Sequence, residues 1–580
     1  MAACGGDDQH RGGLPDASTA QLIVDPPDVA VTIINDVAVV QPYTAHIFDA
    51  SGVQIDVTAE TAFTLSDPDF GTFDGANLSV TGHGAGMVRV QGTARGRMGD
   101  AGLAVTVQKI VVDPAIPDAP TLFQNATEDP TLAPKIVYPS DKILVPPNLG
   151  QFDVHWQNNT AAGASLDLFE IKMANQFVDI RLYTTGLDKD RPAPFWTVYA
   201  PDVWLPIAST RQQVALTVAG LRKAAPASKG TAVSQQVDVT NEKSQGGIYY
   251  WTTSSPQGIW RYDVGKPDVP PAPFFAGDQP TPCIGCHVLS RDGSKMAMTI
   301  DSATGRGTVY NVSDRSVLLP FDGANNKPQL HFDFAAFDSG ATKLITIEGG
   351  VMNLRQLDGT LITGPVAPST ANVQTTMPEL SPDDTKLVDV EYPGGEDFET
   401  SSGSIMIRSF DPVANTFGAP TALVPYVAPD GNNPAIANWY PSFSPDGEWV
   451  VFTRTNGQNY DQASAETWMV KADGLSPPVK LDLANLAGTD NLTNSWARWV
   501  PFAQTFGADN QKLFYLTFSS KRPFGVRLPN GGQPQIWMTP VFPDRAAVGQ
   551  DPSGNAFRVP FQDVTTSNHI AQWTKAVVVQ

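Results

Sequence analysis

The segment Tyr440–Phe452 reads YPSFSPDGEWVVF. Its centre, Ser444–Gly447, holds a serine, a proline, an aspartate and a glycine, which are the residues that tight turns favour. Apolar residues precede this turn, and the apolar run Trp449–Phe452 follows it. Two short apolar runs joined by such a turn predict a hairpin of buried β-strands.

The same pattern recurs through the C-terminal half of the chain. The residue that opens the turn recurs as Ser290, Asp338 and Ser381, at spacings of 48 and 43 residues. Periods of about 40–50 residues predict the blades of a β-propeller, whose four-stranded sheets are buried only against their neighbours. The six copies are Val288–Ala297, Ala336–Ile345, Pro378–Leu387, Tyr440–Phe452, Ala497–Pro501 and His569–Thr574.

The sixth copy starts too late to supply a whole blade. It begins at His569, close to the last residue of the sequence, Gln580. Residues 247–251 and 258–264 are aromatic and β-branched runs that belong to no other copy. We therefore expect them to be the outer strands of the last blade, so that strands from both ends of the ring share one sheet.

The Ser-Pro-Asp-Gly turn at Ser444–Gly447 and its relative at Ser381–Asp384 resemble the TolB-like family of propellers. The resemblance covers about residues 245–580. It implies a six-bladed β-propeller over residues 244–580.

Two smaller β domains are predicted before the propeller. Over residues 20–110, short strands and turns alternate about every ten residues, as a β-sandwich requires. The order of these pieces resembles bacterial Ig-like domains of the invasin and intimin type, which implies a spacer. The next segment, residues 111–243, opens with a proline-rich joint at residues 114–120.

The segment 111–243 predicts a second Ig-like or fibronectin-type sandwich. Phe152, Val154 and Trp156 alternate along one strand and share one face, so we expect His155 to face solvent. The predicted fold class is therefore all-β, with two Ig-like β-sandwiches followed by a six-bladed β-propeller.

Residues Cys283–His287 read CIGCH, the attachment motif of haem c. Two thiols at this spacing can bond the two vinyl groups of one haem, and the adjacent His287 can then bind the iron. We expect one haem c per chain, held by Cys283, Cys286 and His287. Two other interpretations stay open: half of a zinc site, which needs two more ligands, and an unliganded dithiol or disulfide.

A sixth iron ligand would come from the other histidines and methionines. Aligned on its turn, His287 corresponds to Pro441, at the mouth of the predicted central channel. His569, at the start of the sixth blade, is the first candidate ligand, followed by Met377 and then His331. The aromatic residues expected to flank the haem are Trp439, Tyr440, Trp496 and Trp573.

The charge of the chain limits its partners. The 580 residues include 38 basic and 59 acidic side chains, a net charge of −21. Such a charge argues against nucleic acid and anionic membranes and favours a basic redox partner. No apolar run is long enough to span a bilayer. Neither a Gly-x-Ser-x-Gly hydrolase motif nor a glycine-rich phosphate loop is present, so we predict no catalytic residue.

The first residues, MAACGGDD, resemble the end of a bacterial lipoprotein signal, with Cys4 as the residue to be lipidated. The charged region and most of the apolar region of such a signal are missing, so either the start codon is placed too late or the sequence was trimmed; the alternative is a chance cysteine near a disordered end. Residues 1–19 are expected to form a flexible tether. Lipidation and haem c both imply export to the periplasm, the outer membrane or the cell surface. Asp67, Asp69 and Asp74 could bind calcium, but turn formation explains them better.

Together these patterns predict an exported monohaem c-type cytochrome, an electron-transfer protein rather than a catalyst. One alternative is a surface binding or scaffold protein with haem structural or absent. Another is a haem peroxidase-like enzyme with an open sixth position on the iron.

Overall fold

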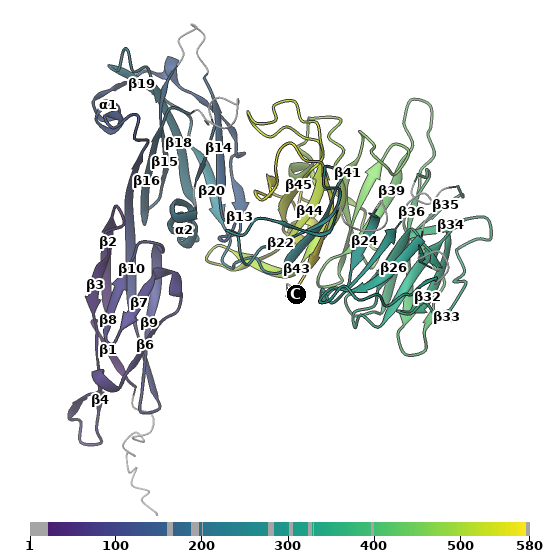
Figure 1. Cartoon of the computed structure of the whole chain (residues 1–580), viewed down its shortest axis with the longest axis horizontal. Coiled ribbons are helices and arrows are strands. Elements are labelled where there is room, and N and C mark those ends of the chain that lie inside the picture. Colours follow the sequence, from purple (N-terminus) through teal and green to yellow (C-terminus); the bar gives the residue numbers. More distant parts are fainter. Residues whose placement is uncertain are drawn as a thin grey trace, which may run out of the picture.

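The computed structural model describes residues 21–158, 166–186, 196–199, 201–276, 284–300, 306–322, 327–328, 330–395 and 399–575. Over these residues the chain is all-β, as predicted. The N-terminal strands form a tall column beside a ring of sheets (Figure 1). The helices in these ranges are short: α1 (Ala119–Asn125), α2 (Pro201–Ser209), α3 (Asp482–Asn485) and α4 (Pro543–Ala547).

The ring is a propeller of six blades. Its innermost strands contact one another in the order β24, β30, β34, β39, β43, β47 and back to β24, which closes the ring. From the axis outward, blade 1 is β24 (Ile284–Leu289), β25 (Lys295–Ile300), β26 (Arg306–Asn311) and β29 (Leu330–His331). Blade 2 is β30 (Phe334–Phe337), β31 (Lys343–Glu348), β32 (Val351–Gln356) and β33 (Leu361–Thr363). Blade 3 is β34 (Gln374–Leu380), β35 (Lys386–Tyr392), β36 (Ser404–Asp411) and β38 (Thr421–Val424), and β37 (Thr416–Phe417) also pairs with β36.

Blades 4 and 5 follow in chain order, and blade 6 closes the ring. Blade 4 is β39 (Ala437–Phe443), β40 (Trp449–Thr455), β41 (Glu466–Lys471) and β42 (Val479–Lys480). Blade 5 is β43 (Ser495–Phe506), β44 (Gln511–Ser520), β45 (Gln535–Val541) and β46 (Phe557–Arg558). Blade 6 is β47 (Asn568–Thr574), β21 (Gly247–Thr252), β22 (Gly258–Asp263) and β23 (Ala272–Ala276).

Blade 6 confirms the predicted closure of the ring. Strand β47 pairs antiparallel with β21 from Gly247–Thr574 to Thr252–Asn568. The innermost strand thus comes from the C-terminal end of the ring and the three outer strands from its N-terminal end.

The serine of the repeat explains why the hairpin turn forms. Ser444 Oγ donates a hydrogen bond to Asp446 Oδ1 at 2.5 Å and accepts one from the Trp449 N–H at 3.0 Å. Gly447 has a φ of +72°, where a residue without Cβ is favoured. One side chain therefore fixes the turn and the start of the next strand, as serine and aspartate do in such turns.

The N-terminal column contains one long sheet and three small ones. Small sheets are formed by β1 (Ile23–Asp25), β4 (Thr44–Phe48) and β5 (Gln54–Asp56); by β3 (Val39–Pro42), β8 (Asn77–Val80) and β7 (Gly71–Asp74); and by β12 (Lys135–Tyr138), β14 (Phe152–Gln157) and β17 (Trp196–Tyr199). The long sheet holds β2 (Asp28–Ile34), β6 (Ala62–Leu65), β9 (Gly86–Ala94), β10 (Arg97–Val112), β11 (Thr127–Glu128), β13 (Ile143–Val145), β15 (Leu168–Ala174), β16 (Val178–Thr184), β18 (Val214–Leu221), β19 (Ser228–Thr231) and β20 (Gln235–Val239).

Strand β10 runs across the boundary placed at residue 110. Residues Arg97–Val105 pair with β9 and Gly102–Gln108 with β2, and residues Val107–Val112 pair in parallel with Val178–Tyr183 of β16. A single strand of 16 residues therefore joins the two N-terminal parts. Their Ig-like character remains a prediction.

His155 joins the column to the propeller, and its predicted exposure to solvent is wrong. The side chain is fully buried, with its ring 4.7 Å from Phe524 of the propeller and 5.3 Å from Tyr138. Asp153, on the same strand, forms an ion pair with Arg527 at 3.0 Å. The strand is covered on both faces because the propeller packs against it, which alternation within one strand could not predict.

Candidate functional site

A narrow cavity of about 120 Å³ lies on the axis of the ring. The innermost strand of every blade contributes to its wall, so it is the central channel of the propeller. Turn residues such as Arg291 and Pro445 also line it, so it reaches the end of the ring where these turns lie. The volume suits several water molecules or one small ion, whereas sites for larger organic ligands measure about 300–1,000 Å³.

A repeated β-bulge shapes the channel wall. The innermost strand contains one extra residue in blade 1 and in blades 3 to 6, and β43 of blade 5 has a second irregularity further along. The first bulge residue has a positive φ in blades 3 to 6: Met377 (+52°), Tyr440 (+53°), Trp496 (+58°) and Ile570 (+50°). Such backbone costs about 1–3 kcal/mol per residue outside glycine and persists only where the surroundings impose it. Bulges of this kind redirect side chains, here toward the axis.

Six side chains at equivalent positions of the innermost strands form what we call the channel ring. Its six members occupy one position in each blade, two residues before the residue that opens the turn or its equivalent. Polar members come from blades 3 to 6, and apolar ones from blades 1 and 2. The channel ring is Val288, Ala336, Glu379, Ser442, Arg498 and Gln572, all of which line the cavity.

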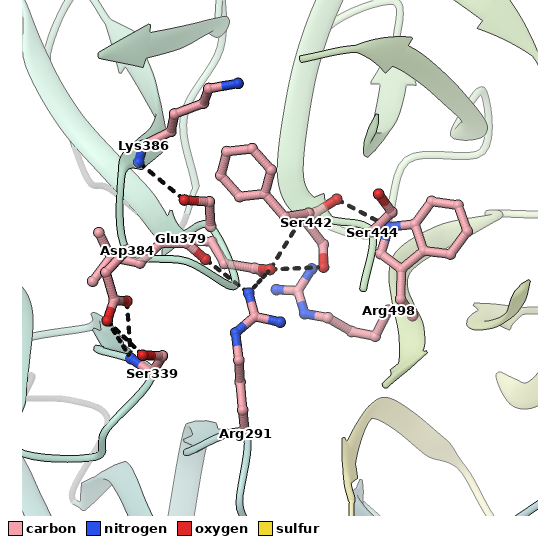
Figure 2. Close-up of polar contacts among 12 residues, drawn as sticks. Arg291, Ser339, Glu379, Asp384, Lys386, Ser442, Ser444 and Arg498 are labelled. Atoms are coloured by element: carbon pink, nitrogen blue, oxygen red, sulfur yellow. Dashed lines mark hydrogen bonds and ion pairs between the residues drawn. The ribbon is translucent and has the colours of Figure 1, made fainter. Parts of the chain in front are cut away.

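Glu379 is held by hydrogen bonds from blade 4 and by an ion pair with a residue of blade 1. Its Oε1 accepts the Ser442 hydroxyl at 3.1 Å and the Phe443 N–H at 3.0 Å. Arg291 reaches over from the turn of blade 1, donates to Leu380 O at 2.8 Å and lies 3.6 Å from Glu379 Oε1. Arg291 and Arg498 reach toward Glu379 from two different blades (Figure 2). The carboxylate therefore has a cationic partner in Arg291.

Arg498 lacks such a partner. Its Nη1 donates to two backbone carbonyl oxygens, those of Ala497 at 3.0 Å and Tyr440 at 3.4 Å. Among the described residues it forms no ion pair. Burial lowers the pKa of the Arg498 guanidinium, although the charge of Glu379 opposes this shift. The channel thus contains a partly buried cation that the described carboxylates do not neutralise by contact.

His287 lies on β24 and also lines the channel. Burial is the main cause that lowers the pKa of its imidazole to about 4, so the ring is neutral at pH 7. Nε2 lies 3.5 Å from the Tyr249 carbonyl oxygen of blade 6, and within the described structure Nδ1 has no hydrogen-bond partner. A neutral imidazole with one nitrogen near a carbonyl and the other unpaired is suited to metal binding.

The rest of the CIGCH motif is only partly described. Cys283 lies outside the described residues, and Cys286 belongs to β24, beside His287. The imidazole fits an iron ligand, but the channel cavity of about 120 Å³ is too small for a macrocycle. A haem on these residues would therefore have to lie outside the cavity.

The three candidate sixth ligands are in different places. His569 is the second residue of β47, which contacts β24. Its Nε2 is 3.0 Å from Ser567 Oγ, and burial lowers its pKa to about 4. Met377 lines the channel, and its Sδ accepts the Tyr440 N–H at 3.4 Å. His331 is exposed on β29, the outermost strand of blade 1. Three strand spacings, about 14 Å, separate β29 from β24, so the structure does not bring His331 to His287.

The predicted flanking aromatics pack inside the ring. Tyr440 stacks on Trp496 with ring centroids 3.8 Å apart. Trp439 is fully buried and donates to Thr455 Oγ1 at 3.0 Å, and Trp573 donates to Thr517 Oγ1 at 3.0 Å. These contacts hold neighbouring strands and blades together, and Trp496 and Trp573 also line the channel.

The remaining candidates have structural partners or are not described. Cys4 falls outside the described residues. Asp67 accepts a bond from Arg211 at 2.8 Å, Asp69 pairs with Lys243, and Asp74 is exposed at the end of β7. Within the described ranges, no cluster of three or more His, Cys, Asp or Glu residues could hold a metal ion. No helix there is both long and apolar enough to cross a membrane.

Sequence reasoning missed the polar side of the channel. Glu379, Ser442 and Arg498 occupy the same repeat position, which the alignment of the six copies already contained. A search for charged or polar residues at equivalent positions of the repeat would have found them. Arg291 could not have been found in this way, because it reaches Glu379 from a different blade.

The chain is thus a six-bladed β-propeller preceded by β domains. No protein-family model and no curated protein matches it. Solved structures that resemble it include a TolB-like protein from Agrobacterium tumefaciens, 13% identical, covering 55% of this chain and 89% of that one at a TM-score of 0.29. An auxiliary nutrient-binding protein from Bacteroides thetaiotaomicron is 10% identical, with 67% and 96% covered and a TM-score of 0.31. A chain of a nidogen–laminin complex is 9% identical, with 58% of this chain and 99% of that one covered and a TM-score of 0.34. Scores this low carry no argument, so the fold assignment rests on the strand pairing.

Proposed function

We propose that this protein is an exported monohaem c-type cytochrome that transfers electrons at the cell envelope. The observation that carries the proposal is the CIGCH sequence of Cys283–His287, joined to a buried, neutral imidazole at His287. Cys283 and Cys286 would bond the haem covalently, and His287 would bind its iron. When bound, the haem would supply a one-electron redox couple.

The protein's own residues would set the properties of that couple. Burial keeps the His287 imidazole uncharged, which is the form that binds a metal. The Tyr249 carbonyl, 3.5 Å from Nε2, helps to fix the orientation of the ring. The stacked pair of Tyr440 and Trp496 would supply apolar surroundings on the inner side of the ring. A net charge of −21 favours docking to a basic redox partner.

Export and anchoring are parts of the same proposal. Lipidation of Cys4 would tether the chain to a membrane, and the N-terminal β domains would hold the propeller away from it. The location would be the periplasm, the outer membrane or the cell surface. Haem c is attached after export, which agrees with each of these locations.

A binding or scaffold function is the second candidate. The small polar channel favours it, because the channel admits no macrocycle and its polar residues are built from several blades. On this account the propeller recognises a partner or a small ligand, and haem is structural or absent. The peroxidase-like alternative would require an open sixth position on the iron.

The haem test has a clear expected result. Exported from a host that matures cytochromes c, the protein should give a pyridine haemochrome spectrum of one haem c per chain. Cys283→Ala/Cys286→Ala should abolish covalent haem, because both thioether bonds are lost. Cys4→Ser is the matched control, since it removes the only other cysteine, and should keep full haem content. Wild-type protein without covalent haem would contradict the cytochrome and leave the binding function.

The sixth ligand is tested separately by native absorption spectra. His569→Ala should convert a low-spin spectrum to a high-spin one, because β47 contacts the strand that carries His287. Met377→Ala should not, because its sulfur is already engaged by the Tyr440 N–H. His331→Ala is the control and should leave the spectrum unchanged. A high-spin wild-type spectrum would instead support the open sixth position.

A further inference from the structure

We propose that the channel, at the end reached by the turn residues, binds a small monoanionic carboxylate through Arg498, with Arg291 and Gln572 beside it. Nothing in this proposal depends on haem. It rests on the cavity and on the charged and polar side chains that line it.

Arg498 is the main reason to expect an anion. Its side chain is partly buried, and its hydrogen-bond partners are the carbonyl oxygens of Ala497 and Tyr440, both on Nη1. Its Nε and Nη2 have no hydrogen-bond partner in the described part of the chain. A partly buried guanidinium gains little from the surrounding carbonyl oxygens alone, whereas a bound carboxylate could accept two parallel hydrogen bonds from it.

Gln572 is a second polar group in the same wall. Its side chain is 8% exposed, lines the cavity and has no hydrogen-bond partner among the described residues. It occupies the same channel-ring position in blade 6 as Arg498 does in the adjacent blade 5. An amide N–H beside a guanidinium is a suitable pair of donors for one carboxylate group.

The local charge favours a monoanion over a dianion. Arg291 and Arg498 supply two positive charges near the turns, and Glu379 supplies one negative charge that is already bonded to Ser442 and Phe443. Asp333, the other carboxylate that lines the cavity, precedes β30 and so lies at the opposite end of the strands. One bound negative charge therefore balances the turn-side end, whereas a second would be repelled by Glu379.

The size of the cavity limits the ligand to a few heavy atoms. A volume of about 120 Å³ fits acetate or a similar small acid. Acetate is therefore the probe, and chloride and sulfate at equal ionic strength are the comparison anions. Calorimetric titration of the full-length protein should show saturable binding of one acetate per chain, with weaker binding of sulfate.

Two channel variants and one control test the assignment. Arg498→Gln should weaken acetate binding at least tenfold. Glu379→Gln adds one net positive charge and should strengthen sulfate binding at least tenfold. Arg454→Gln is the matched control: Arg454 is largely buried, packs on Trp468 and does not line the cavity, so acetate binding should persist.

Three results would overturn the proposal. They are wild-type protein that binds acetate no better than chloride, Arg498→Gln that binds acetate as wild type does, and Arg454→Gln that loses binding as strongly as Arg498→Gln. Circular dichroism shows whether each variant is folded. If Arg498→Gln does not fold, the sulfate affinity of Glu379→Gln decides, and an unchanged affinity rejects the site.

Discussion

A chain that ends at Ser567 is expected to lose the folded propeller. This truncation removes β47, the innermost strand of blade 6, and leaves β21 without its partner at the axis. It also removes Trp573, which is 7% exposed and donates to Thr517 of blade 5. Losing one buried tryptophan costs about 3–5 kcal/mol. Losing the whole strand should exceed the stability of about 5–15 kcal/mol that folded domains have.

The truncation can be checked by limited proteolysis and near-ultraviolet circular dichroism. We expect rapid digestion of residues 247–567 and loss of the aromatic signal. A chain ending at Lys575 is the matched control, because it keeps all of β47 and should behave as wild type. A compact, protease-resistant propeller in the shorter chain would show that the ring does not depend on the shared blade.

Arg408→Met is expected to be the most damaging single substitution of a charged residue. Arg408 and Asp389 have fully buried side chains 2.9 Å apart, and Glu391 lies 3.4 Å from the same guanidinium. Removing the cation leaves two buried carboxylates, which costs about 3–5 kcal/mol. The apparent melting temperature of the propeller should fall by about 5–10 °C.

This loss should depend on pH. Burial raises the pKa of Asp389 to about 6, above its ordinary value of 3.8. The raised pKa contributes stability to the folded state that is fully present below about pH 4 and is lost as the pH rises through 6. Without Arg408 the pKa of Asp389 rises further, so Arg408→Met should be more damaging at pH 8 than at pH 5. Thermal melts at both pH values measure the difference.

Two further variants separate the buried charge from other effects. Asp389→Asn added to Arg408→Met should recover part of the stability at pH 8. Lys480→Met breaks a partly exposed pair with Glu466 in the same ring and should cost less than about 1 kcal/mol. Equal losses for Lys480→Met and Arg408→Met would contradict the explanation.

Much of the propeller could be predicted because its signals are local. The turn at Ser444–Gly447 depends on hydrogen bonds within six residues, from Ser444 to Trp449, so the same letters give the same turn wherever they recur. The repeat period then gave the blades, and the two unassigned strands near residue 250 predicted the closure that β47 and β21 form.

The environment of individual side chains could not be predicted in the same way. His155 alternates as an exposed residue would, yet the propeller covers it. His331 is near the start of blade 2 in the sequence, yet it lies on β29, the outermost strand of blade 1, where it pairs with Arg306 of β26. In both cases the surroundings come from residues distant in the chain, so the spacing within one strand contains no information about them.

The sequence by itself determined the all-β class, the six-fold repeat, the shared blade and the CIGCH motif, because each depends on short-range patterns or residue identity. The tertiary structure alone decided where Arg291, Glu379 and Arg498 meet. These residues come from blades 1, 3 and 5, and closure of the ring places them around one narrow channel. Within the described residues, closure of the ring leaves Arg498 without a contacting carboxylate, a property of the folded ring and not of any single segment.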